Sequence, residues 1–139
     1  MIISMDNDTG GLINMAVTLL QRGGAIIAQI EGDLDHHSAA GIRADIDHAV
    51  RVSEITRLVL DFSRVTFMDS SGIGLVMGRY KLMTERGGKC VVADPPAYIS
   101  RVMRISGINR LCEIVHIQRE SAEAESPQAE PSGERGVKI

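Results

Sequence analysis

The sequence predicts an α/β domain in which a mixed, mostly parallel β-sheet is flanked by α-helices, with an antiparallel hairpin at its N-terminal edge. Strand-like apolar runs alternate with helical patterns from residue 25 onward, which is typical of a parallel sheet. A Gly-Gly pair separates the first two strand-like runs and predicts the hairpin. The length of 139 residues and the apolar content of 44% fit one domain with one packed core.

The first half of the chain predicts a hairpin followed by a helix. Residues 12–20 and 25–31 are strand-like, and "QRGG" between them favours a turn. After "GDLDHHS", four apolar residues recur at the spacing of one helix face: Ile42, Ile46, Ala49 and Val50. Arg43, Asp45 and Asp47 fall on the other side. This helix is therefore expected to bury one face and to expose the three charged residues.

The middle of the chain predicts a buried strand and a second helix. Residues 57–62, "RLVLDF", are apolar enough for a central strand, and a loop is expected to lead from there to "TFMDSS". A helical pattern then runs from Ser71 to about Arg86, and Gly87 and Gly88 are expected to end it. The apolar stripe of this helix is expected to contain Ile73, Val76, Met77, Tyr80 and Met83.

The last third predicts strand, helix and strand. Residues 89–94, "KCVVAD", are strand-like, Pro95 and Pro96 suit a helix start, and Gly107 suits its end. The residues expected to be buried in that helix are Ile99, Val102 and Met103. Residues 111–115, "LCEIV", predict the final strand. We expect 1–11 to be an N-terminal extension, 12–117 the domain, and the acidic, Pro- and Glu-containing residues 118–139 a disordered tail with a short helical start near 118–125.

Composition argues against several classes of partner. Four aromatic residues and a formal charge of −3 provide neither stacking rings nor a basic face, so nucleic acid is not expected as a partner. No run approaches the roughly 20 apolar residues of a membrane span, and no secretion signal is recognisable, so we expect a cytoplasmic protein without a membrane partner. Cys90 and Cys112 lack C-x-x-C spacing and are interpreted as buried small hydrophobic residues.

The stretch "FMDSSGIG", residues 67–74, is partly similar to three enzyme motifs but matches none of them. A nucleophile elbow needs a glycine two residues before its serine, which Ser70 and Ser71 both lack. A P-loop needs a lysine directly after its second glycine, and the glycines at 72, 74 and 78 miss the dinucleotide spacing by one residue. We therefore expect no enzyme activity and no cofactor; a small nucleotide hydrolase would be the alternative.

His36 and His37 could suggest a metal site, because Asp33 and Asp35 precede them. Adjacent residues on a helix point about 100° apart and do not share a ligand face. The sequence therefore favours an exposed loop and helix start, with Asp35 as the N-cap and no metal.

Asp69, Ser70 and Ser71 have the residue types that cap a helix, but capping leaves the glycines after them unexplained. Ser70, Gly74 and Gly78 are spaced by four residues and predict a strip without large side chains on one helix face, with Ser71 beside it. An interior glycine costs roughly 1 kcal/mol of helix stability relative to alanine, which suggests that another backbone approaches closely. A serine at a helix N-terminus is also a good phosphate acceptor.

Three segments of the chain resemble the STAS-domain family, in its branch of sporulation anti-sigma factor antagonists. They are "GDLDHHSA", "FMDSSGIGLVMGRYKLM" and "RISGI", within a resemblance that covers about residues 12–116. The resemblance implies a STAS-like fold and a non-enzymatic partner switch. The unphosphorylated protein would bind the anti-sigma F factor, which is also a serine kinase, and free the sigma factor. That kinase would phosphorylate Ser70, and a PP2C-type serine phosphatase would restore the active form.

The resemblance also implies which residues contact the partner. The expected set comprises Asp33, Asp35, His36, Asp69, Ser71, Gly72, Gly74 and Gly78. Asp33 stands where the family usually has Glu. The Pro/Glu-rich tail stands where the family is expected to have a more regular final helix. An antagonist of a general-stress anti-sigma factor, or a stressosome-type regulator, is the alternative function on the same fold.

Overall fold

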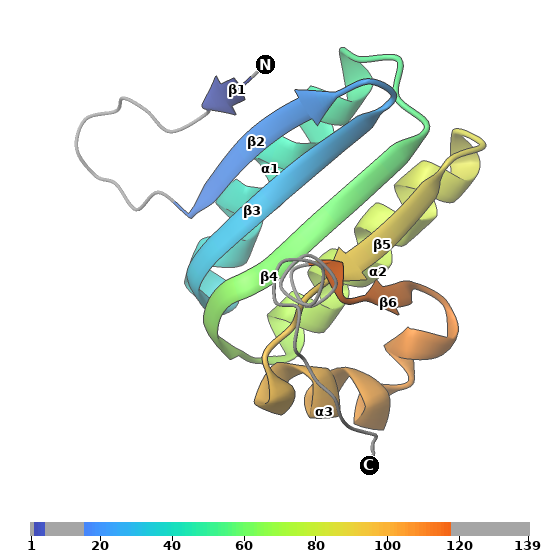
Figure 1. Cartoon of the computed structure of the whole chain (residues 1–139). Helices are drawn as coiled ribbons and strands as arrows, with labels where there is room; N and C mark the ends of the chain where they lie inside the picture. Colours follow the sequence, from blue (N-terminus) through green and yellow to red (C-terminus); the bar gives the residue numbers. More distant parts are fainter. Residues whose placement is uncertain (1, 5–15, 118–139) are drawn as a thin grey trace, which may run out of the picture.

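The computed structural model describes residues 2–4 and 16–117, and within these ranges the chain forms one mixed sheet with helices packed on it (Figure 1). The strands are β1 (Ile2–Ser4), β2 (Val17–Arg22), β3 (Ala25–Leu34), β4 (Arg57–Met68), β5 (Lys89–Ala93) and β6 (Glu113–Val115). The helices are α1 (His36–Arg51), α2 (Ser70–Glu85), α3 (Ala97–Ser106) and a short 3-10 helix, η1 (Ile108–Arg110).

The described strands follow the order β1-β2-β3-β4-β5-β6 across the sheet. β2 pairs antiparallel with both β1 and β3, whereas β3, β4, β5 and β6 pair in parallel. Both α1 and α2 lie on one face of the sheet, and α3 lies near the carboxyl ends of the parallel strands (Figure 1). The predicted fold class is therefore confirmed. No strand was expected before residue 12, so β1 is an element that the sequence did not predict.

The core lies between the sheet and the two long helices. α1 packs on β2 and β3, and α2 packs on β4 and β5. The four residues predicted for the buried face of α1 are all buried there. The predicted hairpin is also confirmed: β2 and β3 pair around a turn at Gly23 and Gly24, where Gly23 has a φ of +57° that favours glycine. Residues 12–15 of the predicted first strand lie outside the described residues.

The loop predicted after residue 62 is wrong, because β4 continues without interruption to Met68. Its pairing with β3 contains two register shifts, one between Gln29 and Glu31 and one between Gly32 and Asp33. Such irregularities break the alternation of buried and exposed residues from which a strand is recognised. Gly32 adopts a φ of +90° at the second shift, a conformation that favours glycine.

The predicted apolar stripe of α2 is only partly correct. Val76 and Met83 are buried as expected, whereas Ile73, Met77 and Tyr80 are half-buried at the edge of the core. The helix instead buries Gly72, Leu75 and Arg79, so its inner face is rotated relative to the prediction. It spans Ser70–Glu85, and Gly87 after it has the expected left-handed conformation, with a φ of +76°.

The last predicted helix and strand are confirmed with small differences. α3 buries Ile99 and Met103 and ends at Gly107, whose φ is +85°, while Val102 is half-buried. The final strand begins at Glu113 rather than at residue 111. The tail and its expected helical start at 118–125 lie outside the described residues. Among the helices that the structure describes, none has the length and apolar character needed to cross a membrane.

Both cysteines are buried, as the sequence predicted, and both are free thiols. The Cys112 thiol donates a hydrogen bond to the backbone carbonyl of Cys90 over 3.1 Å. Interaction with the Cys112 thiol, together with burial, raises the pKa of the Cys90 thiol. Cys90 therefore stays protonated near neutral pH and packs as a small hydrophobic residue.

Candidate functional site

The carboxyl ends of β3 and β4 bring together the two segments that sequence analysis singled out. Asp33 pairs with Phe67 and Leu34 with Met68 in the parallel ladder. Just beyond the strands, the Asp69 amide donates a hydrogen bond to the Leu34 carbonyl over 3.3 Å. The starts of α1 and α2 are therefore neighbours, and residues separated by more than 30 positions in the sequence form one surface.

The start of α2 is capped by Asp69, which leaves Ser70 exposed. The Asp69 carboxylate accepts a hydrogen bond from the Ser71 amide over 2.8 Å. Ser70 is the first residue of the helix and is exposed, whereas Asp69 and Ser71 are half-buried. Because Asp69 performs the capping, the Ser70 hydroxyl is available for another role.

Asp35 caps α1 in the same way and confirms the predicted N-cap. Its carboxylate accepts hydrogen bonds from the amides of His37, over 2.9 Å, and Ser38, over 3.1 Å. The Asp35 amide in turn donates to the Ser38 hydroxyl over 3.1 Å, which completes a capping box. The hydrogen bond from the Ser38 amide is the main reason that the pKa of Asp35 is lowered. We therefore expect Asp35 to position this segment rather than to contact a partner through its carboxylate.

Asp33 lies at the end of β3, not in the loop that the sequence predicted. Its carboxylate accepts a hydrogen bond from the Thr66 hydroxyl over 2.9 Å, and its backbone carbonyl accepts one from the Ser38 hydroxyl over 2.8 Å. Asp33 is exposed, and an ionised carboxylate can accept further hydrogen bonds. The structure thus holds an accessible negative charge in a fixed position at this edge of the sheet.

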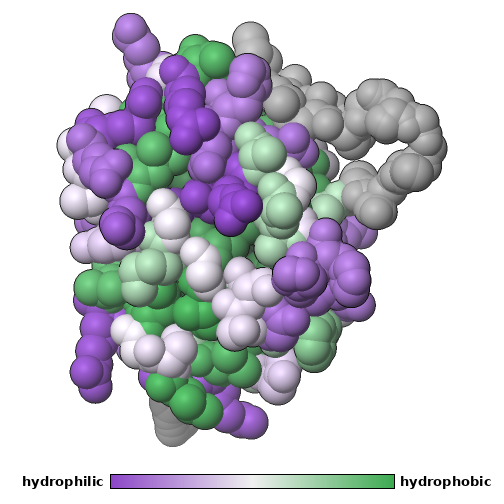
Figure 2. All heavy atoms as spheres, turned by 180° about the vertical axis from the view of Figure 1, so that it is seen from behind, coloured by the Kyte–Doolittle hydropathy of each residue, from purple (hydrophilic) through white to green (hydrophobic). Residues whose placement is uncertain are grey.

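A groove of about 320 Å³ runs between α1 and α2, and we call it the interhelical groove. The residues that line it are His36, Ala39, Ala40, Arg43, Ser71, Gly74 and Leu75. Figure 2 shows this side of the molecule, where hydrophobic residues reach the surface between hydrophilic ones. Small side chains on both helices keep the groove open.

Gly74 and Gly78 border open space, as the predicted strip requires. A Cβ atom built on either residue would have nothing within 4 Å outside its own helix, and Gly74 is exposed. Gly72 differs, because it is buried and a Cβ there would collide with the Met68 side chain and lie 3.1 Å from Leu34 Cδ2. Packing inside the domain therefore explains the glycine at position 72, and its predicted contact with a partner stays a prediction.

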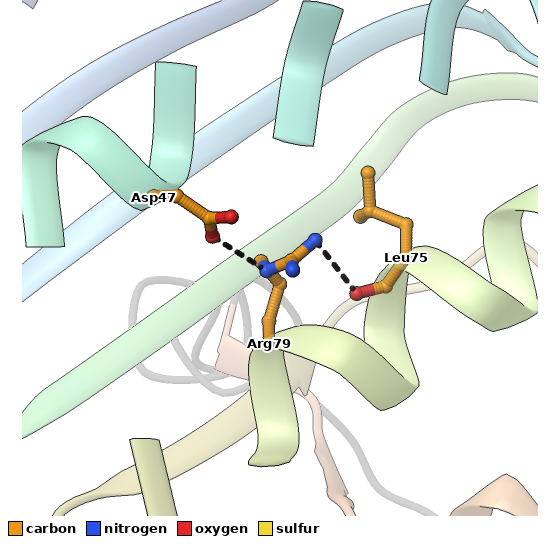
Figure 3. A network of polar contacts seen from close by, with 3 residues as sticks. All are labelled: Asp47, Leu75 and Arg79. Atoms are coloured by element: carbon orange, nitrogen blue, oxygen red, sulfur yellow. Dashed lines mark hydrogen bonds and ion pairs between the residues drawn. The ribbon is translucent and has the colours of Figure 1, made fainter. Parts of the chain in front are cut away.

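An ion pair that sequence analysis missed joins the two helices (Figure 3). Arg79 Nε lies 2.9 Å from Asp47 Oδ1, and Arg79 Nη1 donates a long hydrogen bond of 3.4 Å to the Leu75 carbonyl. The Arg79 side chain is 7% exposed and that of Asp47 14%. Burial lowers the pKa of Arg79, and the charge of Asp47 opposes this effect.

The Asp47–Arg79 pair corrects the expectation that Asp47 lies on an exposed helix face. It links α1 and α2, and Arg79 also bonds to the carbonyl of Leu75, which lines the interhelical groove. A change in either residue would therefore alter the spacing of the groove walls. The sequence contained one signal, an arginine in the apolar part of α2, but it did not identify the partner on α1.

Phe67 is a second residue that sequence analysis did not include in the site. Phe67 is 43% exposed. It directly follows Thr66, whose hydroxyl donates a hydrogen bond to Asp33. Exposed aromatic residues commonly act as anchors in protein interfaces. The residue could not be assigned from the sequence because this part of β4 was expected to be a loop. We use the term docking surface for six residues that we expect a partner to contact: Asp33, His36, Phe67, Ser70, Gly74 and Gly78.

His36 and His37 are exposed at the start of α1, where the sequence placed them. Their rings pack edge to face with centroids 5.7 Å apart. Across the part of the chain that the structure describes, no group of three or more His, Cys, Asp or Glu side chains could hold a metal ion.

Comparison with known proteins identifies one family. The STAS domain family model matches residues 16–124. An anti-sigma F factor antagonist of Paenibacillus polymyxa is 32% identical over 102 residues, which cover 73% of this chain and 87% of that protein. An anti-sigma-B factor antagonist of Bacillus subtilis is 26% identical over 102 residues, covering 73% of this chain and 92% of that protein.

The fold also matches solved structures of the anti-sigma factor antagonist SpoIIAA. Its unphosphorylated form has a TM-score of 0.65 and 28% sequence identity, over 83% of this chain and 100% of that chain. The phosphorylated form of this Bacillus cell fate determinant has a TM-score of 0.60 and 28% identity, over 79% of this chain and 100% of that chain.

Proposed function

Because this chain belongs to the STAS domain family of the anti-sigma factor antagonists, we propose that it is the antagonist in a sporulation partner switch. In its unphosphorylated form it binds the anti-sigma F factor, a serine kinase, and thereby frees sigma factor F. Phosphorylation of Ser70 ends the binding, and a PP2C-type phosphatase restores the binding by removing the phosphate. The observation that carries this proposal is the exposed Ser70 at the start of α2, followed on the same helix by the open positions 74 and 78.

The position of Ser70 supports a switch that leaves the fold intact. A phosphate on the first residue of α2 would lie near the positive end of the helix dipole, which stabilises added negative charge. Ser70 is exposed, so the phosphate would displace no core residue. The modified and unmodified proteins are therefore expected to share one structure.

The same phosphate would prevent a partner from approaching the docking surface. It adds about −1.5 to −2 charges and three acceptor oxygens directly after Asp69, the N-cap of α2. A partner adapted to the neutral serine would have to bury this charge without a counterion, which disfavours binding. Loss of binding thus follows from desolvation and repulsion, without a conformational change.

A partner that fits the docking surface would present a largely apolar surface with at least one basic residue. Phe67 provides an aromatic anchor, and Gly74 and Gly78 permit close approach of a backbone. The exposed Asp33 carboxylate would pair with a cationic side chain of the partner.

A general-stress antagonist, or a stressosome-type regulator, is the second candidate function. A relative named as an anti-sigma-B factor antagonist is 26% identical, compared with 32% for a relative named as an anti-sigma F factor antagonist. The higher identity favours the sporulation partner.

Calorimetric titration of the purified chain with the anti-sigma F factor and with a general-stress anti-sigma factor distinguishes the two candidates. We expect tight binding to the anti-sigma F factor, and loss of that binding after incubation with ATP. Tighter binding to the general-stress factor would assign the second function. Binding to neither would refute both.

A further inference from the structure

We propose that residues 117–125 form a short helix that covers the helix-free face of the sheet, so that the chain's own C-terminal segment occupies this face. The helix-free face is the side of the sheet opposite α1 and α2 (Figure 1). It shares no residue with the docking surface, so the proposal does not depend on the partner switch.

A second apolar cluster, which we call the sheet-face cluster, lies on the helix-free face. It contains strand residues only: Val59, Val91 and Ala93 are buried, and Ile27 and Val115 pack against them. The residues on either side of Val59 and Val91 belong to the main core, together with the buried hydrophobic residues of α1, α2, α3 and η1. Because successive side chains point to opposite faces of a strand, the sheet-face cluster points away from the main core.

The burial of the sheet-face cluster requires a cover. Val91 is 0% exposed, Ala93 2% and Val59 5%. Gln29 lies two residues after Ile27 on the same face of β3, and it is exposed. An open sheet face leaves its side chains in contact with water, whereas parallel sheets usually have both faces covered. Since no described helix contributes to the cluster, another segment must exclude water from Val91 and Ala93.

The exposure along one apolar row shows where this cover lies. Leu20, Ile27, Val59 and Val91 are aligned across β2, β3, β4 and β5 by the strand register. The residues on β4 and β5 are buried, whereas those on β2 and β3 are half-buried. The cover therefore lies over β5 and β4. An occupant that entered from the β2 edge, such as residues 5–15, would bury Leu20 first.

The chain leaves the sheet on the side where the row is buried. β6 borders β5, and it ends at Val115. Two residues later, Ile117 has helical backbone conformation. The match to the STAS domain family model continues past β6 to residue 124. The segment after β6 is therefore part of the domain and begins beside the sheet-face cluster.

The length of this segment matches the pattern of burial. A helix of residues 117–125 would be about 14 Å long. β6 and β4 are separated by two strand spacings, or about 10 Å. The helix would thus reach Val91 and Val59 but would end before Leu20.

The sequence of the segment fits a helix that packs on a flat surface through small side chains. Ile117, Ser121 and Ala124 are spaced by four and three residues and would share one helix face. Ala122 and Glu123 would lie on the outer side. A helix of this length is only marginally stable in isolation, so contact with the sheet would supply its stability. A segment bound in this way closes the helix-free face to other proteins.

Paramagnetic relaxation in the ¹⁵N-labelled full chain tests the proposal. A nitroxide spin label is attached at Glu123→Cys; the native cysteines, Cys90 and Cys112, are buried. We expect loss of the amide signals of the sheet-face cluster, with much weaker effects on the amides of α1. The matched control is the spin label at Glu134→Cys, which removes the same charge outside the proposed helix and should not cause this selective loss.

Three outcomes of the relaxation measurement would overturn the proposal. The first is no loss of sheet-face signals with the label at Glu123→Cys, and the second is an equal loss with the label at Glu134→Cys. The third concerns a mixture of ¹⁵N-labelled native chain and unlabelled chain that carries the spin label at Glu123→Cys. Loss of the sheet-face signals in this mixture would show that a second copy covers the face.

Thermal unfolding of two alanine variants tests which face of the segment contacts the sheet. Ala124→Glu would place a carboxylate against the apolar sheet-face cluster and should lower the Tm, because burying an unpaired charge is unfavourable. Ala122→Glu is the matched control on the outer side and should keep the native Tm. Equal Tm values for the two variants would contradict the proposed contact.

Discussion

Replacing Gly74 by leucine separates the stability of α2 from the accessibility of its surface. Because a Cβ atom at position 74 would meet nothing within 4 Å outside its own helix, the substitution causes no clash in the free protein. Leucine has a higher helix propensity than glycine, by about 0.5–1 kcal/mol. For a domain of this size that gain raises the Tm by roughly 2–8 °C.

The same substitution should prevent partner binding. The introduced isobutyl group would project from the lining of the interhelical groove, where a closely packed partner must leave space for it. Forcing extra atoms into a packed contact costs about 1–3 kcal/mol, and every 1.4 kcal/mol corresponds to about a tenfold change in Kd. We therefore expect the affinity for the anti-sigma factor to fall by about 5- to 100-fold while the protein becomes more stable.

The chain offers a matched control in Gly41→Leu. Gly41 lies in the interior of α1, is exposed and also borders open space, but it does not line the interhelical groove. This variant should gain similar thermal stability and keep the native affinity. Calorimetric titration and thermal unfolding of both variants are the assays. An unchanged affinity for Gly74→Leu, or an equal loss for Gly41→Leu, would refute the reasoning.

Three further predictions concern packing and contacts around the same surface. Gly72→Ala should lower the Tm, because overpacking against Met68 costs about 1–3 kcal/mol and outweighs a propensity gain of about 1 kcal/mol; a raised Tm would contradict the packing seen at Gly72. Arg79→Met should destabilise the fold by roughly 2–3 kcal/mol in urea unfolding, and Arg79→Met/Asp47→Leu should recover most of this loss; an unchanged single variant would show that the ion pair is not structural. Phe67→Ser should weaken anti-sigma factor binding by about 2 kcal/mol with little change in Tm, and a native Kd would remove Phe67 from the docking surface.

The sequence was sufficient to predict the elements whose apolar pattern is local. The buried face of α1 and the turn at Gly23 and Gly24 depend on residues a few positions apart, and the structure has them as predicted. The second half of β4 was missed because register shifts in its pairing with β3 disturb the alternating pattern.

The details of the candidate site depend on contacts that are distant in sequence. The spacing placed Gly74 on the strip without large side chains and left Gly72 off it, but only the fold shows that Met68 encloses Gly72 while Gly74 borders open space. Arg79 is buried on the inner part of α2, and its ion-pair partner, Asp47, lies on another helix. The proximity of the Asp33 and Ser70 segments was implied by a family resemblance, whereas its physical cause is the parallel pairing of β3 and β4.

Mapping the phosphate after incubation with the anti-sigma F factor and ATP tests the central claim most directly. Mass spectrometry of the native chain should place one phosphate on Ser70, and the modified protein should no longer bind its kinase. Ser71→Ala is the matched control and should be phosphorylated normally. Ser70→Ala should accept no phosphate and should bind the anti-sigma F factor before and after incubation with ATP. A phosphate on Ser71 or Ser63, or a Ser70-phosphorylated chain that keeps its affinity, would contradict the account.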